Sequence, residues 1–407
     1  MQKEDLLVWQ NAEVQQWLHN HATDDPTRLL LGAPPLGDLV PPKALAQQLA
    51  GWQKARQKLP SYYNTPGLAY PPSLSMEQCS SEDTARWKSQ FLNGKRFADL
   101  TGGFGVDAHF LGLSFEEVHY VERNEELAAL AKHNFGILRP AHIQVHQQLA
   151  EDFLDQLTEP FDWFYLDPAR RDEQQGRVFR LADCTPNAAE LAPGLLQKST
   201  RVMLKASPLL DIQQGLQELG GAEKVIVLAV KNEVKELLYI LGPESTDDPE
   251  ILGVNLTPSE EERFEIRRSE ESRSQAPIGA ITEYVYEPNA ALMKAGAFNA
   301  LACRFGLQKL HPNTHLYTHT EKVISFPGRK FRVKEVLPAQ KKALRKAIPQ
   351  GKAHVAVRNF PLTADQLRAK LALQEGGALF VYGFTNHEGQ KQVAILERWE
   401  ASTDNLA

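Results

Sequence analysis

The sequence predicts a doubly wound α/β domain, in which helices cover both faces of a parallel sheet, between an N-terminal helical region and smaller C-terminal α+β domains. Two observations support this prediction. From residue 95 onward, short apolar runs alternate with stretches of helical spacing, which is typical of parallel strands joined by helices. The last two apolar runs, 224–230 and 234–242, are separated by a few polar residues, which indicates an antiparallel hairpin.

Residues 1–90 are expected to form the N-terminal helical region. Apolar residues from Leu6 to Leu18 roughly follow helical spacing. A stretch rich in Pro and Gly separates them from a second expected helix over 44–59. Ser81 can cap a third helix that runs through Trp87 and Phe91.

The α/β core is expected over 91–242, with seven strands of which the last is antiparallel. The expected strands are 96–101, 117–123, 142–147, 163–168, 201–207, 224–230 and 234–242. The expected helices are 106–111, 125–135, 152–157, 186–196 and 209–219. After a linker at 243–248, a small α+β region over 249–320 and a basic α+β domain over 321–400 complete the chain.

Charge is unevenly distributed along the 407 residues. Between positions 329 and 370 there are twelve Lys or Arg and two acids, a net charge of +10, which leaves −16 for the rest of a chain of net charge −6. On this basis the basic domain binds a polyanion, and the cations expected to contact phosphates are Arg332, Lys341, Lys342 and Arg345.

The composition places few other constraints on function. No apolar run reaches the roughly 18–20 residues of a membrane helix, and the acidic N-terminus does not resemble a signal peptide. Cys79, Cys184 and Cys303 form no zinc or disulfide pattern. We therefore expect a cytoplasmic protein without a membrane segment or a metal.

A glycine-rich turn after the first core strand is the densest candidate site. Glycines allow a sharp turn and the close approach of a ligand. The candidate cofactor-binding residues here are Asp99, Thr101, Gly102, Gly103, Phe104, Gly105 and Asp107.

Carboxylates follow the next three strands, where ligands sit in open α/β sheets. Glu122, beside Arg123, can accept hydrogen bonds from both ribose hydroxyls. Asp152 can accept from an adenine amine while Phe153 packs on the ring. Asp167 and Pro168, after the fourth strand, are the candidate catalytic residues. The turn also fits the dinucleotide fingerprint G-x-G-x-x-A, but a dehydrogenase does not explain Asp99, Asp152 or the terminal hairpin.

Taken together, these residues over about 91–241 resemble a class I S-adenosylmethionine-dependent methyltransferase, with its seven-stranded Rossmann-like sheet. The narrower motifs EQCSS (77–81), DPARR (167–171), LKASPLLD (204–211) and VRNFPLTADQLRAKL (357–371) are similar to bacterial members with a ferredoxin-like piece and a THUMP-like C-terminal domain. The resemblance implies S-adenosylmethionine as cofactor. Because THUMP domains bind RNA, it also implies tRNA or rRNA as partner.

The substrate side departs from relatives that methylate base amines or pyrimidine carbons. Ala169 and Arg170 replace the Pro and aromatic residue of the amine-methylating loop, and no cysteine lies near Lys205 for covalent C5 chemistry. Direct transfer to a nitrogen or oxygen remains, with Asp167 orienting the acceptor or taking its proton. The side chains expected to bind substrate near the transfer line are Arg170, Arg171, Lys205 and Ser207.

Two alternatives stay open. The first is a methyltransferase that acts on a small molecule or a protein. The second is a catalytically silent RNA-binding protein that keeps the α/β fold.

Overall fold

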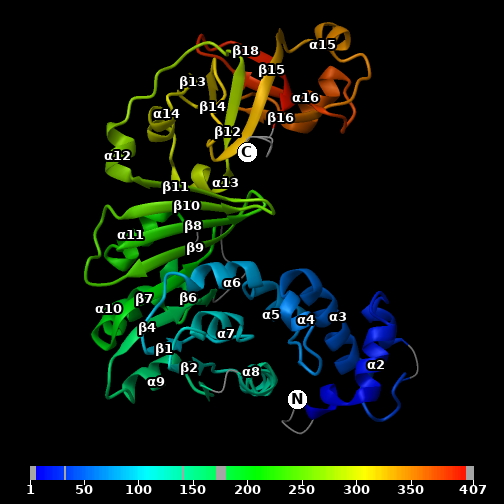
Figure 1. Ribbon diagram of the computed structural model, residues 1–407, viewed down its shortest axis with the longest axis vertical. Helices are drawn as coiled ribbons and strands as arrows, with labels where there is room; N and C mark the ends of the chain where they lie inside the picture. The colour runs from blue at the N-terminus through cyan, green and yellow to red at the C-terminus, as the bar shows by residue number, and fades with distance from the viewer. Residues whose placement is uncertain (1–5, 32–33, 140–141, 171–179, 400–407) are drawn as a thin grey trace, which may run out of the picture. The chain divides into compact units, whose positions relative to one another are not determined.

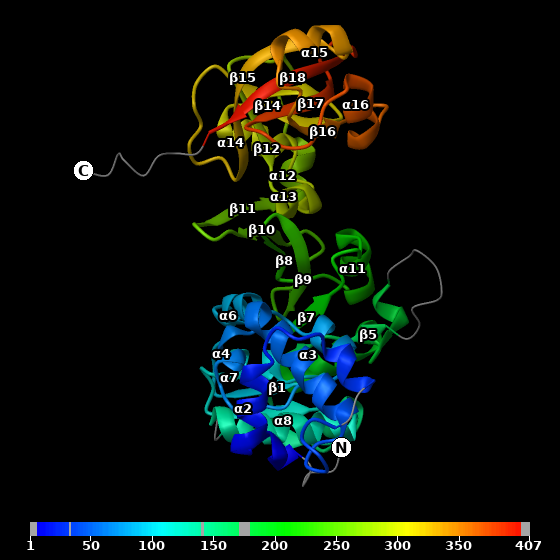
Figure 2. The ribbon, with the colours of Figure 1, turned by 90° about the vertical axis from the view of Figure 1, so that its right-hand side faces the viewer.

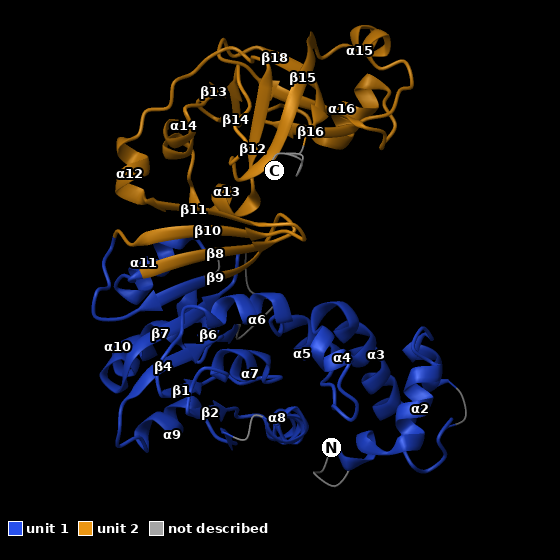
Figure 3. Cartoon of the chain, in the orientation of Figure 1, with its two compact units in different colours: residues 1–223, 238–247 blue, residues 224–237, 248–407 orange. Residues whose placement is uncertain are grey.

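The computed structural model describes residues 6–31, 34–139, 142–170 and 180–399 (Figure 1). The chain divides into two compact units (Figure 3). The first consists of Met1–Glu223 and Leu238–Asp247, and the second of Lys224–Leu237 and Asp248–Ala407.

Short helices build the N-terminal region of the first unit. They are η1 (Leu7–Gln10), α2 (Ala12–Asn20), η2 (Pro26–Leu30), α3 (Pro42–Lys58), α4 (Pro60–Tyr63), α5 (Ser73–Gln78) and α6 (Glu82–Ser89). Ser81 caps α6, since its hydroxyl accepts a hydrogen bond from the backbone N–H of Thr84 at 3.2 Å. Buried side chains of these helices, among them Trp9 and Leu49, form one apolar cluster with Phe104 and Phe110 of the α/β core. The helices are therefore packed onto the core.

The main sheet has nine strands, in the order β11-β10-β8-β9-β7-β4-β1-β2-β3. The strands are β1 (Arg96–Asp99), β2 (Glu117–Val121), β3 (Ile143–His146), β4 (Phe161–Leu166), β7 (Ser199–Ala206), β8 (Lys224–Val230), β9 (Glu233–Leu241), β10 (Glu250–Leu256) and β11 (Glu261–Arg267). The pairs β1–β2, β1–β4, β2–β3 and β4–β7 are parallel. A turn of two residues with positive φ, Lys231 and Asn232, reverses the chain between β8 and β9.

The predicted α/β architecture is confirmed, but the predicted number of seven strands is too small. Strand β10 pairs in parallel with β8, and β11 pairs antiparallel with β10. Both strands lie beyond residue 249, in the segment that we expected to be a separate small domain. Strands were expected in this segment, but not their place in the main sheet, because β10 pairs with the distant strand β8 and β11 joins the sheet only through β10.

Helices cover both faces of the parallel strands. They are α7 (Val106–Gly112), α8 (Glu125–Leu138), α9 (Ala150–Asp155), α10 (Ala188–Lys198) and α11 (Ile212–Leu219). Tyr120 of β2 packs against Phe135 of α8, whereas its neighbour His119 contacts Phe153 of α9. Because consecutive strand residues point to opposite faces, α8 and α9 lie on opposite sides of the sheet. A short pair of strands, β5 (Ala169–Arg170) and β6 (Cys184–Thr185), with η3 (Leu181–Asp183), follows β4.

A seven-stranded sheet makes up most of the second unit, in the order β13-β14-β12-β15-β18-β17-β16 (Figures 1 and 2). Its strands are β12 (Tyr284–Pro288), β13 (Gln308–His311), β14 (Thr314–His319), β15 (Gly328–Pro338), β16 (His354–Arg358), β17 (Leu379–Thr385) and β18 (Lys391–Arg398). The helices of this unit are α12 (Arg268–Arg273), α13 (Ala290–Ala295), α14 (Asn299–Phe305), α15 (Lys341–Ala347) and α16 (Ala364–Leu371). Leu344 of α15 and Leu367 of α16 are buried with Val393 and Ile395, so the two helices cover one face of this sheet.

Across the described ranges of the chain, no helix combines the length and the apolar character needed to cross a bilayer.

Candidate active site

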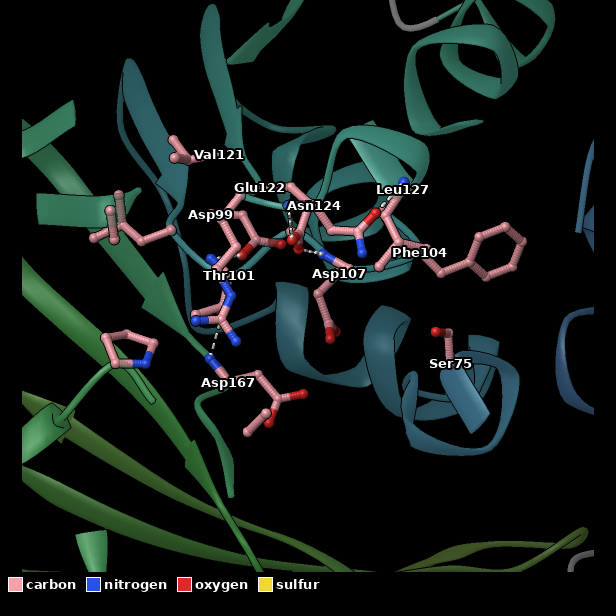
Figure 4. Close-up of a pocket in the computed structure, with 18 of the residues that line it drawn as sticks. Ser75, Asp99, Thr101, Phe104, Asp107, Val121, Glu122, Asn124, Leu127 and Asp167 are labelled. Atoms are coloured by element: carbon pink, nitrogen blue, oxygen red, sulfur yellow. Dashed lines mark hydrogen bonds between the residues drawn. The ribbon is translucent and has the colours of Figure 1, made fainter. Parts of the chain in front are cut away.

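A cavity of about 520 Å³ opens in the first unit where β1, β2 and β4 end (Figure 4). This volume is in the range of small-molecule sites. The cavity is lined by Leu74, Ser75, Gln78, Cys79, residues 99–107, residues 121–124, Leu127, residues 148–151, Asp167, Ala169, Thr185 and Pro186. Among the described residues, no group of three or more His, Cys, Asp or Glu is arranged to hold a metal ion.

The glycine-rich turn has the tight geometry that its sequence predicts. The N–H of Gly105 donates to the carbonyl of Gly102 at 2.8 Å, and Gly103 and Gly105 have φ of +53° and +86°. A Cβ on Gly102 would lie 2.2 Å from the ring of Tyr120, and one on Gly105 would lie 2.8 Å from the ring of Phe135. A Cβ on Gly103 would meet no side chain within 4 Å. Gly103 therefore leaves space free beside the cavity rather than relieving a contact in the core.

Glu122 is tied to this turn by its carboxylate. One oxygen accepts from the N–H of Gly103 at 2.9 Å, and the other accepts from the N–H of Asn124 at 2.7 Å. Each carboxylate oxygen has a second lone pair, so Glu122 can still accept hydrogen bonds from a ligand. The contact with Gly103 also means that a carboxylate already occupies a backbone donor that a dinucleotide-binding turn would offer to phosphate.

Asp99 and Asp167 are joined through Thr101. The Asp99 carboxylate accepts from the N–H of Thr101 at 3.0 Å, and the Thr101 hydroxyl accepts from the N–H of Asp167 at 2.6 Å (Figure 4). Burial raises the pKa of Asp99 well above its usual range, and the nearby carboxylate of Asp107 raises it further. Asp99 therefore stays protonated over a wider pH range than an exposed aspartate would.

Asp167 faces a lysine at the end of the adjacent strand. The Nζ of Lys205 lies 2.6 Å from the Asp167 carboxylate, and Lys205 is 8% exposed. Burial raises the pKa of Asp167, and the ammonium of Lys205 acts against this rise. Lys205, which is predicted to bind substrate, therefore directs its charge at Asp167.

A second buried ion pair lies close by, between Lys88 of α6 and Asp107 of α7, and Asp107 also lines the cavity. Their Nζ and carboxylate are 2.8 Å apart, and Lys88 is 0% exposed. Burial alone would raise the pKa of Asp107, but the ammonium groups of Lys88 and Lys205 outweigh it and lower the pKa. Asp107 is therefore held as a carboxylate inside the protein.

Several predicted site residues lie away from the cavity lining. Asp152 and Phe153 are on α9, and Phe153 is buried against His119, His146 and Phe161 rather than stacked over the cavity. The cavity wall at this point consists of residues 148–151 and so presents Glu151 as its acid. Pro168 and Ser207 are half-buried and are not part of the lining, and the Ser207 hydroxyl accepts from the N–H of Leu209 at 3.3 Å.

Two arginines after Asp167, Arg170 and Arg171, were also expected to bind substrate. The backbone of Arg170 pairs with Cys184 in the β5–β6 pair. Arg171 lies outside the described residues.

The N-terminal region contributes cavity residues that were not predicted. Leu74, Ser75 and Gln78 of α5, with Cys79 after it, form part of the lining. Burial raises the pKa of the Cys79 thiol, and its Sγ lies 3.3 Å from the carbonyl of Met76. A signal for this segment existed in the EQCSS motif, but the motif carried only a family resemblance and no chemistry.

The predicted phosphate-binding cations lie on the surface of the second unit. Lys341, Lys342 and Arg345 are exposed on α15, which buries Leu344 on its other side, and Arg332 is exposed on β15. These side chains have the exposure that binding to a polyanion requires.

Two family models match the second unit: a ferredoxin-like domain over residues 284–327 and a THUMP domain-like model over 328–398. No curated protein matches the chain. The crystal structure of a candidate methyltransferase of Porphyromonas gingivalis W83 is 35% identical, covers 98% of this chain and 100% of its own, and superposes with a TM-score of 0.87.

More distant structures match only part of the chain. A candidate methyltransferase of Streptococcus mutans, solved with SAH, is 18% identical over 30% of this chain and 70% of its own, with a TM-score of 0.24. An rRNA methylase of Streptococcus thermophilus is 14% identical over 39% of this chain and 94% of its own, with a TM-score of 0.29.

The fold and the cavity define a class I methyltransferase architecture. The match to the P. gingivalis protein along almost the entire chain, together with the THUMP-like model, defines the family. This chain belongs to the bacterial class I S-adenosylmethionine-dependent methyltransferases that have a THUMP-like C-terminal domain.

Proposed function

We propose that this protein transfers a methyl group from S-adenosylmethionine to a nitrogen or oxygen atom of an RNA, tRNA or rRNA, in the cytoplasm. The observation that carries the proposal is the cavity where the glycine-rich turn, Glu122 and the Asp167–Lys205 pair meet. Five lining residues are acidic and one, Arg123, is basic; the acids are Asp99, Asp107, Glu122, Glu151 and Asp167. Such a cavity favours a cationic ligand over a dinucleotide, whose pyrophosphate it would repel.

The residues present fit the proposed cofactor. Asp99 would accept from the amino group of the methionine moiety, and Glu122 from the ribose hydroxyls. Gly103 would leave room for the ligand next to the turn. Gln148, Leu149 and Glu151 line the cavity beside the position expected for Asp152 and Phe153 and would contact the adenine in their place. When bound, the sulfonium supplies a methyl group that is already activated for direct displacement.

Asp167 is the candidate for orienting the acceptor and accepting its proton. Lys205 stabilises the carboxylate form, which can act as a proton acceptor, while burial keeps its pKa from falling to that of a strong acid. Cys79 is the cysteine of the described cavity lining, and its raised pKa keeps it a thiol rather than the thiolate that covalent catalysis needs. The arrangement therefore favours direct transfer over a covalent cysteine intermediate.

RNA as the acceptor is supported by the basic surface of the second unit and by the THUMP domain-like match over 328–398. Exposed cations on α15 and β15 can neutralise phosphates without reading sequence.

The test is transfer of a tritiated methyl group from S-adenosylmethionine to total bacterial RNA, to extract protein and to small metabolites. We expect label in RNA, its loss in Asp167→Asn, and its retention in Cys79→Ser. Label found in protein or metabolites and never in RNA would contradict the RNA proposal. Binding of the cofactor without transfer to any fraction would favour a catalytically silent RNA-binding protein.

A further inference from the structure

The buried polar side chains behind the Asp167–Lys205 pair form one continuous network, and neither the cofactor nor the acceptor needs to touch all of it. We propose that Ser80, held in place by Lys88 and Asp107, is a positioning residue that fixes the Lys205 ammonium against the Asp167 carboxylate. This inference rests on the proposed function, because it assigns Asp167 the task of handling the acceptor.

Ser80 is the point at which two ion pairs meet. Its hydroxyl accepts from the Nζ of Lys88 at 2.7 Å and from the Nζ of Lys205 at 3.3 Å, and it donates to the Asp107 carboxylate at 2.8 Å. A serine hydroxyl has one proton and two lone pairs, so these three contacts use its full hydrogen-bonding capacity. Ser80 is 3% exposed, so these contacts lie inside the protein.

The partners of Ser80 are themselves held by other elements. The Tyr165 hydroxyl of β4 donates to the Asp107 carboxylate at 3.0 Å and lies 3.3 Å from the Nζ of Lys88. Lys88 belongs to α6, Asp107 to α7 and Lys205 to β7, so the network connects the N-terminal region to the sheet. Because Ser80 contacts Lys205 directly, its hydroxyl helps to fix the position of the Lys205 ammonium.

The charge of Lys205 matters to Asp167 because burial otherwise favours the protonated acid. Without the Ser80 hydroxyl, the ammonium loses one of its anchors and interacts less closely with Asp167. The pKa of Asp167 should then rise, and the carboxylate form needed at neutral pH should become less populated. The titratable groups that face Asp167 and Lys205 here are Cys79, Lys88, Asp99, Asp107 and Tyr165.

The experiment compares Ser80→Ala with Ser81→Ala in the full-length protein. Ser81 is a matched control because its neighbouring hydroxyl caps α6 and contacts Thr84 rather than a lysine. Aspartate carboxyl carbons labelled with ¹³C are titrated by NMR, with the Asp167 signal assigned from Asp167→Asn. We expect the midpoint of Asp167 to move upward by about one pH unit in Ser80→Ala, and to stay within a few tenths of the wild type in Ser81→Ala.

Two further measurements separate positioning from stability. In Ser80→Ala, the acidic limb of the pH profile of kcat for methyl transfer to total RNA should also move to higher pH. The KM for S-adenosylmethionine should change less than twofold. Ser80→Thr, which keeps the hydroxyl, should restore the wild-type midpoint. Where Ser80→Ala does not fold, Ser80→Cys, close in size but a weak hydrogen-bonding group, replaces it.

The NMR midpoint decides the proposal independently of the acceptor. An Asp167 midpoint that is the same in wild type and Ser80→Ala would overturn the positioning role, whatever the transfer assay shows. Absence of transfer by the wild type, with the midpoint shifted in Ser80→Ala, would instead overturn the proposed function while supporting the network.

Discussion

Replacing Lys88 by Met tests the electrostatics behind the active site most directly. Lys88 and Asp107 are both buried, and removing one partner leaves the other as an uncompensated charge. The Asp107 carboxylate can lose this buried charge only by taking up a proton. An ordinary aspartate has a pKa of about 3.9, so holding it protonated at pH 7 costs about 4 kcal/mol, at about 1.4 kcal/mol per pH unit.

Lys205, Ser80 and Tyr165 remain near Asp107 in the variant and reduce this penalty. We therefore expect Lys88→Met to lose about 3 kcal/mol of unfolding free energy at pH 7. In the wild type the pKa of Asp107 lies below that of the unfolded chain, so its contribution is present above that value and lost as pH falls. In the variant the pKa lies above that of the unfolded chain. The difference between the two proteins should consequently shrink toward pH 4.

Urea unfolding followed by tryptophan fluorescence reports mainly on the first unit, because five of the six tryptophans lie within it. The matched control is Lys54→Met, since Lys54 forms an exposed pair with Glu77 at 2.6 Å and should change stability by less than about 1 kcal/mol. Lys88→Met combined with Asp107→Leu should regain most of the loss. A destabilisation below about 1 kcal/mol that does not vary with pH would refute the reasoning.

Three further predictions concern ligands. Gly103→Ala and Gly220→Ala both place a Cβ in open space at positive φ, and each should cost about 1–2 kcal/mol of stability. Calorimetry should show weaker binding of S-adenosylmethionine for Gly103→Ala and unchanged binding for Gly220→Ala. Equal affinities of the two variants would show that Gly103 is not part of the binding site. The pKa of Asp99 is raised by burial, and the ammonium group of bound S-adenosylmethionine would favour its charged form. Binding of the cofactor should therefore release a proton from Asp99 and become stronger as pH rises, whereas Asp99→Asn should bind weakly at every pH. A wild-type affinity that does not change with pH would contradict this prediction. The last variant replaces four exposed cations by Glu: Arg332, Lys341, Lys342 and Arg345. In filter binding it should bind RNA more weakly and with a smaller dependence on salt concentration. An unchanged salt dependence would argue against contact of these side chains with phosphate.

The predicted site residues that the structure brings together at one cavity are those that follow from strand ends. The glycine-rich turn, Glu122 and Asp167 each come directly after a strand, and parallel strands bring their carboxyl ends to one edge. The acid that the α9 segment contributes to the cavity was harder to choose between neighbours. Helix α9 begins at Ala150, and this start leaves Glu151 in the cavity wall and Asp152 outside it. A shift of one residue in a helix boundary is within the ordinary uncertainty of sequence patterns.

The buried network could not be predicted, because its members come from segments with no common period. Lys88 lies on a short helix whose sequence, EDTARWKS, is mostly polar, and a lysine there is expected to be solvated. Only the packing of α6 against α7 places it beside Asp107. Strand β10 was not assigned to the main sheet for the same reason, since its pairing with β8 joins segments more than twenty residues apart, and β11 joins the sheet only through β10.

The distribution of charge separates two tasks that the proposed reaction requires. Arg123 is the one Lys or Arg of the described cavity lining, and Lys205 beside the cavity is paired with Asp167, so the cavity offers few cations to RNA phosphates. The exposed lysines and arginines of β15 and α15 provide the opposite surface, on a part of the chain that lines no portion of the described cavity. In the proposed reaction the acceptor base or ribose would meet Asp167, and most of the affinity for RNA would come from phosphates bound by these cations. An isolated nucleotide should accordingly be a poor acceptor compared with a longer RNA, because it lacks the phosphates that these cations would bind.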